Sequence, residues 1–224
     1  MSTVQTIPAQ KEPSSFRLIA TLGVAGFFSG VVLVGAFILT EPVILANKAE
    51  RLSKAIYKVL PGCVAYTPLV LEGDVLQPLP EGTELGQEGV DPQVFAGYDE
   101  EGDLIGFAVT SKEPGFQDII GGIFGFDPKA EVIIGMEILE SKETPGLGDK
   151  IFKDAAFQTN FEALSTKSEI EAVKKGEKEK DFQVEAITGA TISSKAVVRM
   201  LNKGMGAWGE AMHLYVETGE GETE

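Results

Sequence analysis

The longest apolar run of the chain lies near its N-terminus. No charged residue occurs between Leu18 and Thr40, and about 20 predominantly apolar residues suffice for a helix to cross the hydrocarbon core of a bilayer. A cleaved signal peptide usually has an apolar core of only ~7–15 residues, and no convincing small-residue cleavage site follows the run. We therefore predict a retained transmembrane helix at 17–41, behind an N-terminal tail at 1–16.

A second, amphipathic pattern follows the apolar run. Pro42 predicts a break in the helix, after which residues 46–60 place apolar side chains at helical spacing, namely Ala49, Leu52, Ile56 and Val59. The Pro61-Gly62 pair ends this second helix. Residues 61–92 are rich in Pro, Gly and Glu and predict a loop with short strands. Residues 42–92 are thus expected to form a linker region of helix and loop.

Period-two patterns dominate the next part of the chain. Two hairpins are predicted, one pairing 94–98 with 104–110 and the other pairing 122–126 with 131–139. In the last of these strands the alternating residues Val132, Ile134, Met136 and Ile138 should share one face. A helix is expected at 149–164, with core contacts from Ile151, Ala155, Phe157 and Phe161. A solvated helix or loop should follow at 165–180, then a strand at 182–187 and a helix from about Ser193.

These elements predict an α+β fold. A single transmembrane helix precedes one domain at 93–212, in which antiparallel hairpins are flanked by helices. Residues 213–224 end in a run of Gly and Glu and are expected to be an acidic, disordered tail.

The charge and the scarcity of Cys and His narrow the function. The net charge is −15, from 34 acidic and 19 basic residues, so nucleic acid is a poor partner. With one cysteine, Cys63, and one histidine, His213, the chain alone offers no disulfide, no Cys/His metal site and no His-based catalytic triad. We predict no metal site and no catalytic residues, so redox chemistry here requires a borrowed cofactor.

The segment from Thr188 to Ser194 has the properties of an anion site. Gly189 and Ala190 lack bulk, so a phosphate can approach the backbone closely. The helix that follows presents free N–H groups and a partial positive charge, and Ser193 or Ser194 can cap it. An ordinary capping turn that binds nothing explains the same residues, and local chemistry leaves both interpretations open.

Two longer motifs resemble the FMN-binding domain family. Thr188-Gly189-Ala190-Thr191, followed by Ile192 and Ser193, resembles the family's flavinylation motif, and Glu143-Thr144-Pro145-Gly146-Leu147-Gly148 resembles its second motif. The segment from Gly115-Phe116-Gln117-Asp118 through Gly125-Phe126-Asp127 is similar to its glycine-aromatic segment. The resemblance implies that Thr191 forms a phosphoester with FMN. It further implies that the phosphate is held by Thr188, Gly189, Ala190 and Ser194, and that the ring or ribityl chain is lined by Glu143, Thr144, Gly146 and Leu147.

The family includes the G subunit of the Rnf electron-transport complex and the C subunit of the sodium-pumping NADH:quinone reductase. Chain length and a single span favour similarity to the former. This implies an electron-carrying subunit, not an independent enzyme, that assembles with other membrane and peripheral subunits and is matured by a flavin transferase that takes FMN from FAD. The nearest alternative is the same carrier in a quinone reductase or another extracytoplasmic chain. A non-redox, membrane-anchored binding or assembly domain is a further alternative.

The side of the membrane receives conflicting indications. More basic residues follow the span than precede it. Those that follow are Lys48, Arg51, Lys54 and Lys58. Counting them weakly favours a cytoplasmic domain, although large domains translocate largely regardless of nearby charge. The family resemblance implies the opposite: a single-pass protein of the bacterial or archaeal cytoplasmic membrane, with a cytoplasmic tail and an extracytoplasmic flavin domain.

Overall fold

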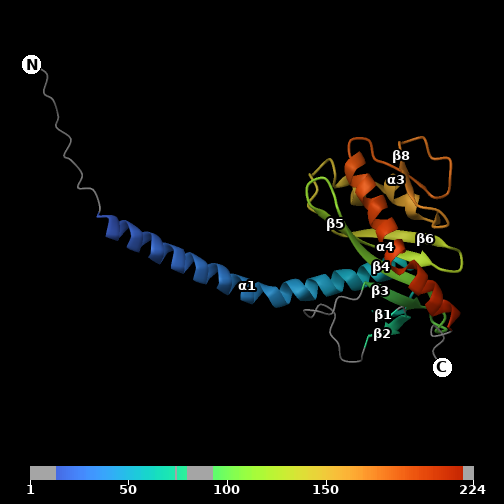
Figure 1. Cartoon of the computed structure of the whole chain (residues 1–224), viewed down its shortest axis with the longest axis horizontal. Coiled ribbons are helices and arrows are strands. Elements are labelled where there is room, and N and C mark those ends of the chain that lie inside the picture. Colours follow the sequence, from blue (N-terminus) through green and yellow to red (C-terminus); the bar gives the residue numbers. More distant parts are fainter. Residues whose placement is uncertain (1–13, 74, 80–92, 219–224) are drawn as a thin grey trace, which may run out of the picture. The chain divides into compact units, whose positions relative to one another are not determined.

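The computed structural model describes residues 14–73, 75–79 and 93–218 of the chain. The chain consists of two compact units, 1–47 and 48–224. The elements are labelled in Figure 1. Helix α1, Ser15–Val59, runs through Pro42 without a break, so the predicted interruption is wrong. Proline removes one backbone donor, and a long helix tolerates that loss when its other hydrogen bonds remain.

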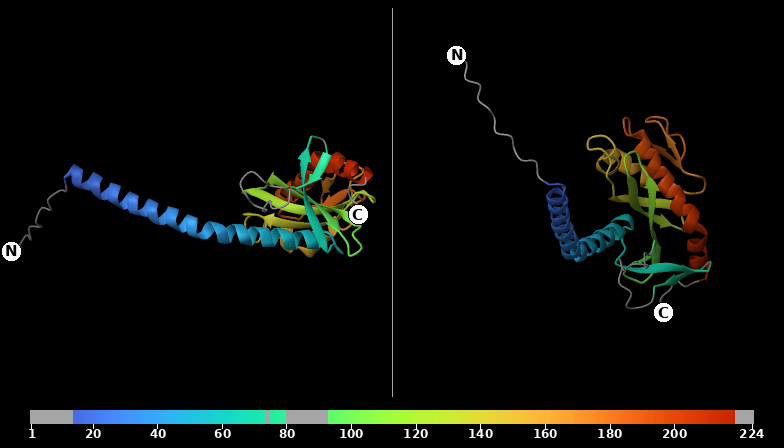
Figure 2. Two further views of the ribbon diagram at one scale, coloured as in Figure 1. Left: turned by 90° about the horizontal axis from the view of Figure 1, so that it is seen from below. Right: turned by 60° about the vertical axis from the view of Figure 1, so that its left-hand side comes forward.

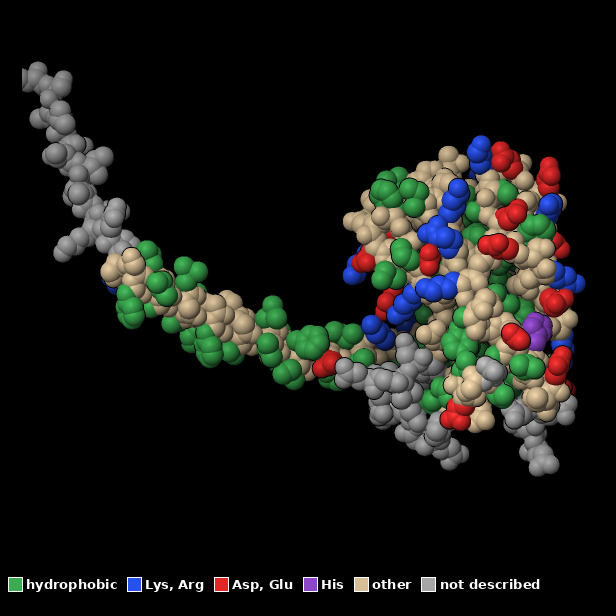
Figure 3. Space-filling model, in the orientation of Figure 1, with side chains coloured by type: hydrophobic (Ala, Val, Ile, Leu, Met, Phe, Trp, Pro, Cys, Tyr) green, Lys and Arg blue, Asp and Glu red, His purple; other side chains and the backbone are tan. Residues whose placement is uncertain are grey.

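The N-terminal part of α1 has the character of a membrane span. Among the described residues, α1 is the one helix that is long and apolar enough to cross a bilayer. None of its most apolar stretch is buried. Large apolar side chains stay exposed on it, with Leu39 at 77% and Phe27 at 68%, and Figure 3 shows them along the helix. The prediction of one candidate membrane helix is confirmed.

The second unit is built on one antiparallel sheet with the strand order β2-β1-β3-β4-β5-β6-β7. Both predicted hairpins are confirmed, as β3–β4 and β5–β6. The strands are β1 (Ala65–Glu72), β2 (Val75–Pro78), β3 (Val94–Tyr98), β4 (Leu104–Pro114), β5 (Ile119–Asp127), β6 (Val132–Glu140) and β7 (Leu164–Ser165). β1 pairs directly with β3, so the predicted linker contributes two strands to the sheet and the domain begins well before residue 93. Residues 80–92 lie outside the described part.

The segment after β6 is more broken than the sequence pattern indicates. The predicted helix at 149–164 is three short turns, α2 (Lys150–Lys153), α3 (Ala155–Gln158) and the 3₁₀ turn η1 (Thr159–Phe161). Asp154 separates the first two, because its side chain accepts hydrogen bonds from two N–H groups of α3. Ile151, Phe157 and Phe161 are buried as predicted, whereas Ala155 is exposed.

Two short parallel strands and the final helix complete the fold. β8 (Glu171–Val173) and β9 (Gln183–Glu185) pair in parallel, so the charged segment contains a strand and the strand expected at 182–187 is shorter. Helix α4 spans Thr191–Glu217 and begins two residues before the predicted start. It also runs past residue 212, with Tyr215 buried, so the predicted tail begins inside a helix. Residues 219–224 lie outside the described part.

The sheet is covered on both faces. Along β4, Phe107 and Val109 enter the larger apolar cluster, which includes the buried side of α4. Ala108, between them in sequence, enters a second cluster with Ile56 and Val59 from the C-terminal end of α1. Figure 2 shows α4 and this end of α1 on opposite sides of the strands. The predicted apolar stripe of residues 46–60 is thus a sheet-facing stripe.

Strand β6 departs from simple alternation. Its register with β5 shifts between the pairs Gly125↔Gly135 and Phe126↔Ile133, which leaves Ile134 as an extra residue, as in a β-bulge. Ile134 therefore packs with the α1 end, while Met136 and Ile138 pack on the α4 side. The prediction that Val132, Ile134, Met136 and Ile138 share one face is wrong for Ile134.

Glycine lets the end of α1 approach the sheet. A Cβ placed on Gly125 would overlap the backbone carbonyl of Val59, and one on Gly135 would lie 3.4 Å from the Val59 Cα. Backbone thus packs directly on backbone at this point, and a side chain here has no room.

Candidate functional site

The turn before α4 is held by its own backbone. Gly189 has φ +84°, a conformation that glycine adopts without the cost a side chain incurs. The Ala190 N–H donates to the Ile187 carbonyl over 2.9 Å, and α4 then begins at Thr191. The chain therefore passes from β9 to α4 within the five residues 186–190, and Thr188 and Thr191 are both exposed.

The two serines expected to cap α4 lie inside its first turn. The buried Ser194 hydroxyl accepts from the Ile187 N–H at 3.0 Å and donates to the Ala190 carbonyl at 2.9 Å. It therefore fastens the turn to the helix from within. Ser194 was predicted to hold a phosphate, but it is fully buried and its hydroxyl is already engaged on both sides, so its place in the turn is structural.

The helix N-terminus itself is open. Ala190 at the cap position provides no side-chain hydrogen bond. Among the hydrogen bonds of the described residues, none uses the backbone N–H of residues 191, 192 or 193. Thr191 is exposed as a residue, and its hydroxyl makes only a 3.5 Å contact with the Ile187 carbonyl. Free N–H groups at the positive end of a long helix favour an anion at this point.

Glu143 joins the two sequence motifs. One carboxylate oxygen accepts from the Ser193 hydroxyl of α4 at 2.6 Å. The other accepts from the N–H groups of Phe116 at 2.9 Å and Gln117 at 3.0 Å. Glu143 is only 6% exposed. It was predicted to line the flavin, but its carboxylate instead ties the β4–β5 turn, the 143–148 loop and the start of α4 to one another.

Two glycines make room for this carboxylate. A Cβ on Gly115 would overlap one carboxylate oxygen of Glu143, and a Cβ on Gly148 would overlap the other. Burial alone would raise the pKa of Glu143, but the hydrogen bonds from Ser193 and from the backbone N–H groups outweigh it and hold the pKa below its ordinary value. The carboxylate is therefore ionised and fixed at neutral pH.

The loop after Glu143 faces solvent. The Thr144 hydroxyl donates to the Gln117 side chain over 2.8 Å, and the Gly146 N–H donates to Asp149 over 2.7 Å. Gly146 has φ +79°. Leu147, at the tip, leaves 52% of its surface exposed, so an apolar side chain is presented beside the turn with nothing in the described structure to cover it.

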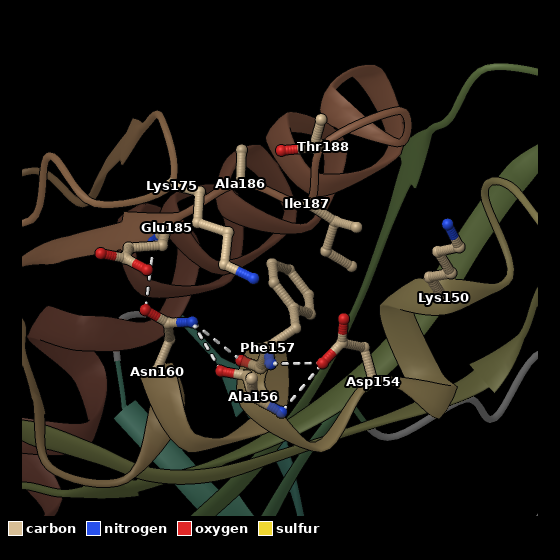
Figure 4. A pocket seen from close by; sticks show the side chains of 10 residues that line it. All are labelled: Lys150, Asp154, Ala156, Phe157, Asn160, Lys175, Glu185, Ala186, Ile187 and Thr188. Atoms are coloured by element: carbon tan, nitrogen blue, oxygen red, sulfur yellow. Dashed lines mark hydrogen bonds between the residues drawn. The ribbon is translucent and has the colours of Figure 1, made fainter.

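A cavity of about 250 Å³ opens next to the Thr188 end of the turn. Figure 4 shows the Phe157 ring and Ile187 in it, with the ammonium group of Lys175 directed toward its interior. Lys150 and Thr188 also line it. Neither Phe157 nor Lys175 is among the site residues predicted from the sequence.

Comparisons with known proteins agree with this geometry. Residues 115–206 match the family model of the FMN-binding domain, and this range contains both motifs and the Glu143–Ser193 connection. This part of the chain is therefore similar to the FMN-binding domain family.

Relatives of the chain include G subunits from two organisms. The G subunit of the ion-translocating oxidoreductase complex of Methanosarcina acetivorans is 28% identical over 188 residues, which cover 83% of this chain and 90% of the relative. The G subunit of the Na(+)-translocating ferredoxin:NAD(+) oxidoreductase complex of Acetobacterium woodii is 34% identical over 123 residues, 54% of this chain and 58% of the relative. The resemblance inferred from the motifs is confirmed.

Solved structures share the fold of the FMN-binding domain. Shewanella oneidensis NqrC superposes with a TM-score of 0.61 at 19% identity and covers 78% of this chain and 100% of its own. The C subunit of the Na(+)-translocating NADH-quinone reductase from Parabacteroides distasonis gives 0.57 at 21% identity, with 75% and 93% covered. The predicted α+β class is confirmed.

The second unit brings together most of the predicted site residues. Thr188, Gly189 and Thr191 share one exposed turn, and Thr144, Gly146 and Leu147 share the exposed loop next to it in the Glu143 network. Ser193 is the connection that the sequence analysis missed as a site residue. Its position directly after the motif was the available clue, but a serine two residues into a helix reads equally well as a cap.

The Glu143 network predicts a specific pH dependence of stability. Because the folded-state pKa of Glu143 is depressed, its contribution is present above the unfolded-state pKa and is lost as pH falls through the lower folded value. We expect Glu143→Gln to lower the free energy of unfolding by about 1–3 kcal/mol at pH 7, with the gap between variant and wild type narrowing in acid. Chemical denaturation of both proteins at neutral and acidic pH measures this, and a gap that does not depend on pH would contradict it.

Proposed function

We propose that the chain is the flavin-carrying G subunit of an Rnf-type, ion-translocating ferredoxin:NAD oxidoreductase, with FMN joined to Thr191 by a phosphoester. The observation that carries this proposal is the exposed residue Thr191 at an open helix N-terminus, in a segment that matches the model of the FMN-binding domain. The similarity to G subunits of ion-translocating complexes supports the assignment of the complex.

The geometry favours Thr191 over Thr188 as the attachment point. Both side chains are exposed, but Thr191 is the first residue of α4, so a phosphate on its oxygen lies beside the unpaired N–H groups of residues 192 and 193. An anion at a helix N-terminus gains roughly 0.3–1 kcal/mol, and up to about 2 in favourable, partly buried geometry. Esterification leaves the phosphate with a single negative charge, which suits a domain as acidic as this one.

Attachment requires a donor and an enzyme. In the proposed maturation a flavin transferase presents FAD, and the Thr191 oxygen attacks the phosphorus on the flavin side of the pyrophosphate. The new O–P bond replaces the bond to AMP, which leaves, and the threonine proton passes to a base of the transferase. No electrons are exchanged, so the product is a flavin phosphodiester on the folded domain.

Neighbouring residues would orient the flavin, which supplies reversible electron transfer when bound. Leu147 and Ile192, 52% and 53% exposed, can cover an apolar ring from the two motifs. Lys150 and Lys175 line the cavity beside Thr188 and place positive charge near the phosphate and the ribityl chain. Glu143 and Ser193 act through position, because their hydrogen bonds hold both motifs at a fixed separation.

We further propose that α1 anchors the chain as a single-pass protein with the flavin domain outside the cytoplasmic membrane, where covalent attachment prevents loss of the cofactor. The other membrane and peripheral subunits of the complex would deliver and remove its electrons. The same carrier in a sodium-pumping NADH:quinone reductase is the alternative, supported by the shared fold of two solved structures from that class of protein. Copurifying subunits distinguish the two.

Electron transfer by membranes tests the function. In a strain that lacks the native chain, we expect reduced ferredoxin to drive little NAD reduction by membranes, wild-type chain to restore it, and Thr191→Ala to restore none of it. The variant must be present at wild-type level by immunoblot. Full restoration by Thr191→Ala would contradict a role for this flavin in the main electron path and leave a non-redox assembly role as the better account.

A further inference from the structure

The turn between β4 and β5 ends in two exposed apolar side chains. Phe116 leaves 67% of its surface exposed and Ile119 leaves 55%. The turn is not loose, because the Phe116 and Gln117 N–H groups are fixed on Glu143 and the Gly115 N–H donates to the Asp118 carbonyl over 2.9 Å. A rigid turn thus presents apolar surface that nothing in the described structure covers.

A collar of cations surrounds this turn. Lys142 pairs with Asp118, Lys48 pairs with Glu140, and Arg199 and Lys203 both pair with Glu113. The charge of Lys112 also acts on Glu140, and the Lys203 ammonium reaches the Lys112 carbonyl. Five cations therefore face these three carboxylates and the buried carboxylate of Glu143, in a chain whose net charge is −15. Figure 3 shows basic side chains gathered in a band beside apolar ones on the face drawn.

The covalent chain keeps this collar close to the bilayer. Lys48 follows the apolar run, which ends at Thr40, by eight residues. Such a segment spans about 12 Å as a helix and at most about 29 Å fully extended. We propose that the β4–β5 turn docks on the anionic phospholipid surface of the membrane that α1 crosses, with Phe116 and Ile119 entering the interface and the collar binding headgroup phosphates.

The charges of the chain select this orientation. An acidic domain tethered to an anionic surface is repelled on most sides, so its basic flank turns toward the lipid. Aromatic and aliphatic side chains among lysines are also the composition of interfacial membrane anchors. A protein partner is less well supported, because two apolar side chains fall short of the roughly 800 Å² per partner of a stable interface.

Docking would set the height of the Thr191 turn above the bilayer. The docked turn is bonded to Glu143, and Glu143 is bonded to Ser193 in the first turn of α4. Lipid contact at Phe116 is therefore transmitted rigidly to the neighbouring Thr191. The docking itself does not depend on flavin attachment, so it can be tested whether or not the proposed function holds.

A tryptophan reporter tests the docking in the full chain. Trp208→Phe removes the native tryptophan, and Phe116→Trp places a new one at the turn. The chain is reconstituted in nanodiscs of neutral lipid or of mixed neutral and anionic lipid, each with brominated acyl chains. The matched control is Lys129→Trp, in the exposed turn at the opposite end of β5.

We expect the tryptophan at position 116 to be quenched at least twofold more in anionic than in neutral nanodiscs, and the one at 129 to be unquenched in both. Lys112→Glu combined with Lys142→Glu should reduce the quenching at 116 to the control level. Equal quenching at 116 and 129, or equal quenching at 116 in both lipids, would overturn the proposal. Quenching or a blue shift at 116 that appears only with the assembled complex would also overturn it and assign the turn to a neighbouring protein of that complex. Ile119→Trp provides a second reporter.

Discussion

Thr191→Ala is expected to abolish covalent flavin while leaving the fold intact. The substitution removes the oxygen that the phosphoester requires. The hydroxyl makes only one 3.5 Å contact, so the free energy of unfolding should change by no more than about 0.5 kcal/mol. In-gel flavin fluorescence under denaturing conditions measures attachment, and circular dichroism of the purified chain measures folding. Both proteins must be produced together with an active flavin transferase.

The same turn provides the control for this experiment. Thr188→Ala removes the hydroxyl of another exposed threonine three residues earlier, and that variant should keep its fluorescence. Thr191→Ser retains an oxygen at the same place and separates loss of the nucleophile from loss of the methyl group. Fluorescence that persists in Thr191→Ala would refute the attachment point. If it persists there and is lost in Thr188→Ala, the attachment point would be Thr188 instead.

Gly125→Ala is expected to be the most destabilising single methyl addition in the sheet. Its Cβ would overlap the Val59 carbonyl, and neither the strand nor the helix end can move without opening the cluster around Ile56 and Ile123. Overpacking of this kind costs about 2–3 kcal/mol. The purified chain should therefore unfold at a clearly lower temperature when followed by circular dichroism in detergent.

Gly121→Ala is the matched control in the same strand. A Cβ at this position meets its nearest neighbour, the Lys112 Cγ, at an ordinary 3.5 Å. Its effect should stay within about 1 kcal/mol, since a compatible Gly-to-Ala change also reduces the entropy of the unfolded chain. Similar melting temperatures for the two variants would show that the end of α1 does not pack on β5 as described.

Side-chain periodicity was sufficient to predict the two central hairpins. The strand after Asp127-Pro128-Lys129 alternates, and the apolar runs before it are separated by turn-forming residues. Periodicity could not reveal the bulge at Ile134, because both faces of the sheet are apolar. An apolar residue therefore fits the pattern whichever face it lies on. It also gave no sign that β1 joins the sheet, since the pairing of Ala65 with Tyr98 is a long-range contact in a segment rich in turn-forming residues.

Helical patterns were less reliable at their ends. Residues 149–164 have apolar side chains at helical spacing. However, the Asp154 side chain caps the N-terminus of α3, so the predicted helix is divided into short turns. Pro42 predicts a break that the long helix α1 does not have. β8 was not predicted within the charged segment 165–180. Its lysines and glutamates give no strand pattern, and its partner β9 lies farther along the chain.

The candidate site was predicted in part. Small residues and hydroxyls identified the turn at 188–191, and the family resemblance supplied its cofactor. The roles of Glu143 and Ser194 could not be read from the sequence, because only tertiary contacts show that both side chains are turned inward. The cavity with Lys175 likewise arises where α3 meets the strand before the turn, at separations in sequence that no local pattern reports.

Peptide mass mapping of the wild-type chain tests the central claim most directly. The chain, purified with its transferase coexpressed, is digested, and the fluorescent peptide is fragmented by tandem mass spectrometry. We predict an added mass equal to FMN less one water, assigned to Thr191. Assignment of that mass to Thr188, Ser193 or any other residue, or a chain that carries no flavin mass after exposure to an active transferase, would contradict the account.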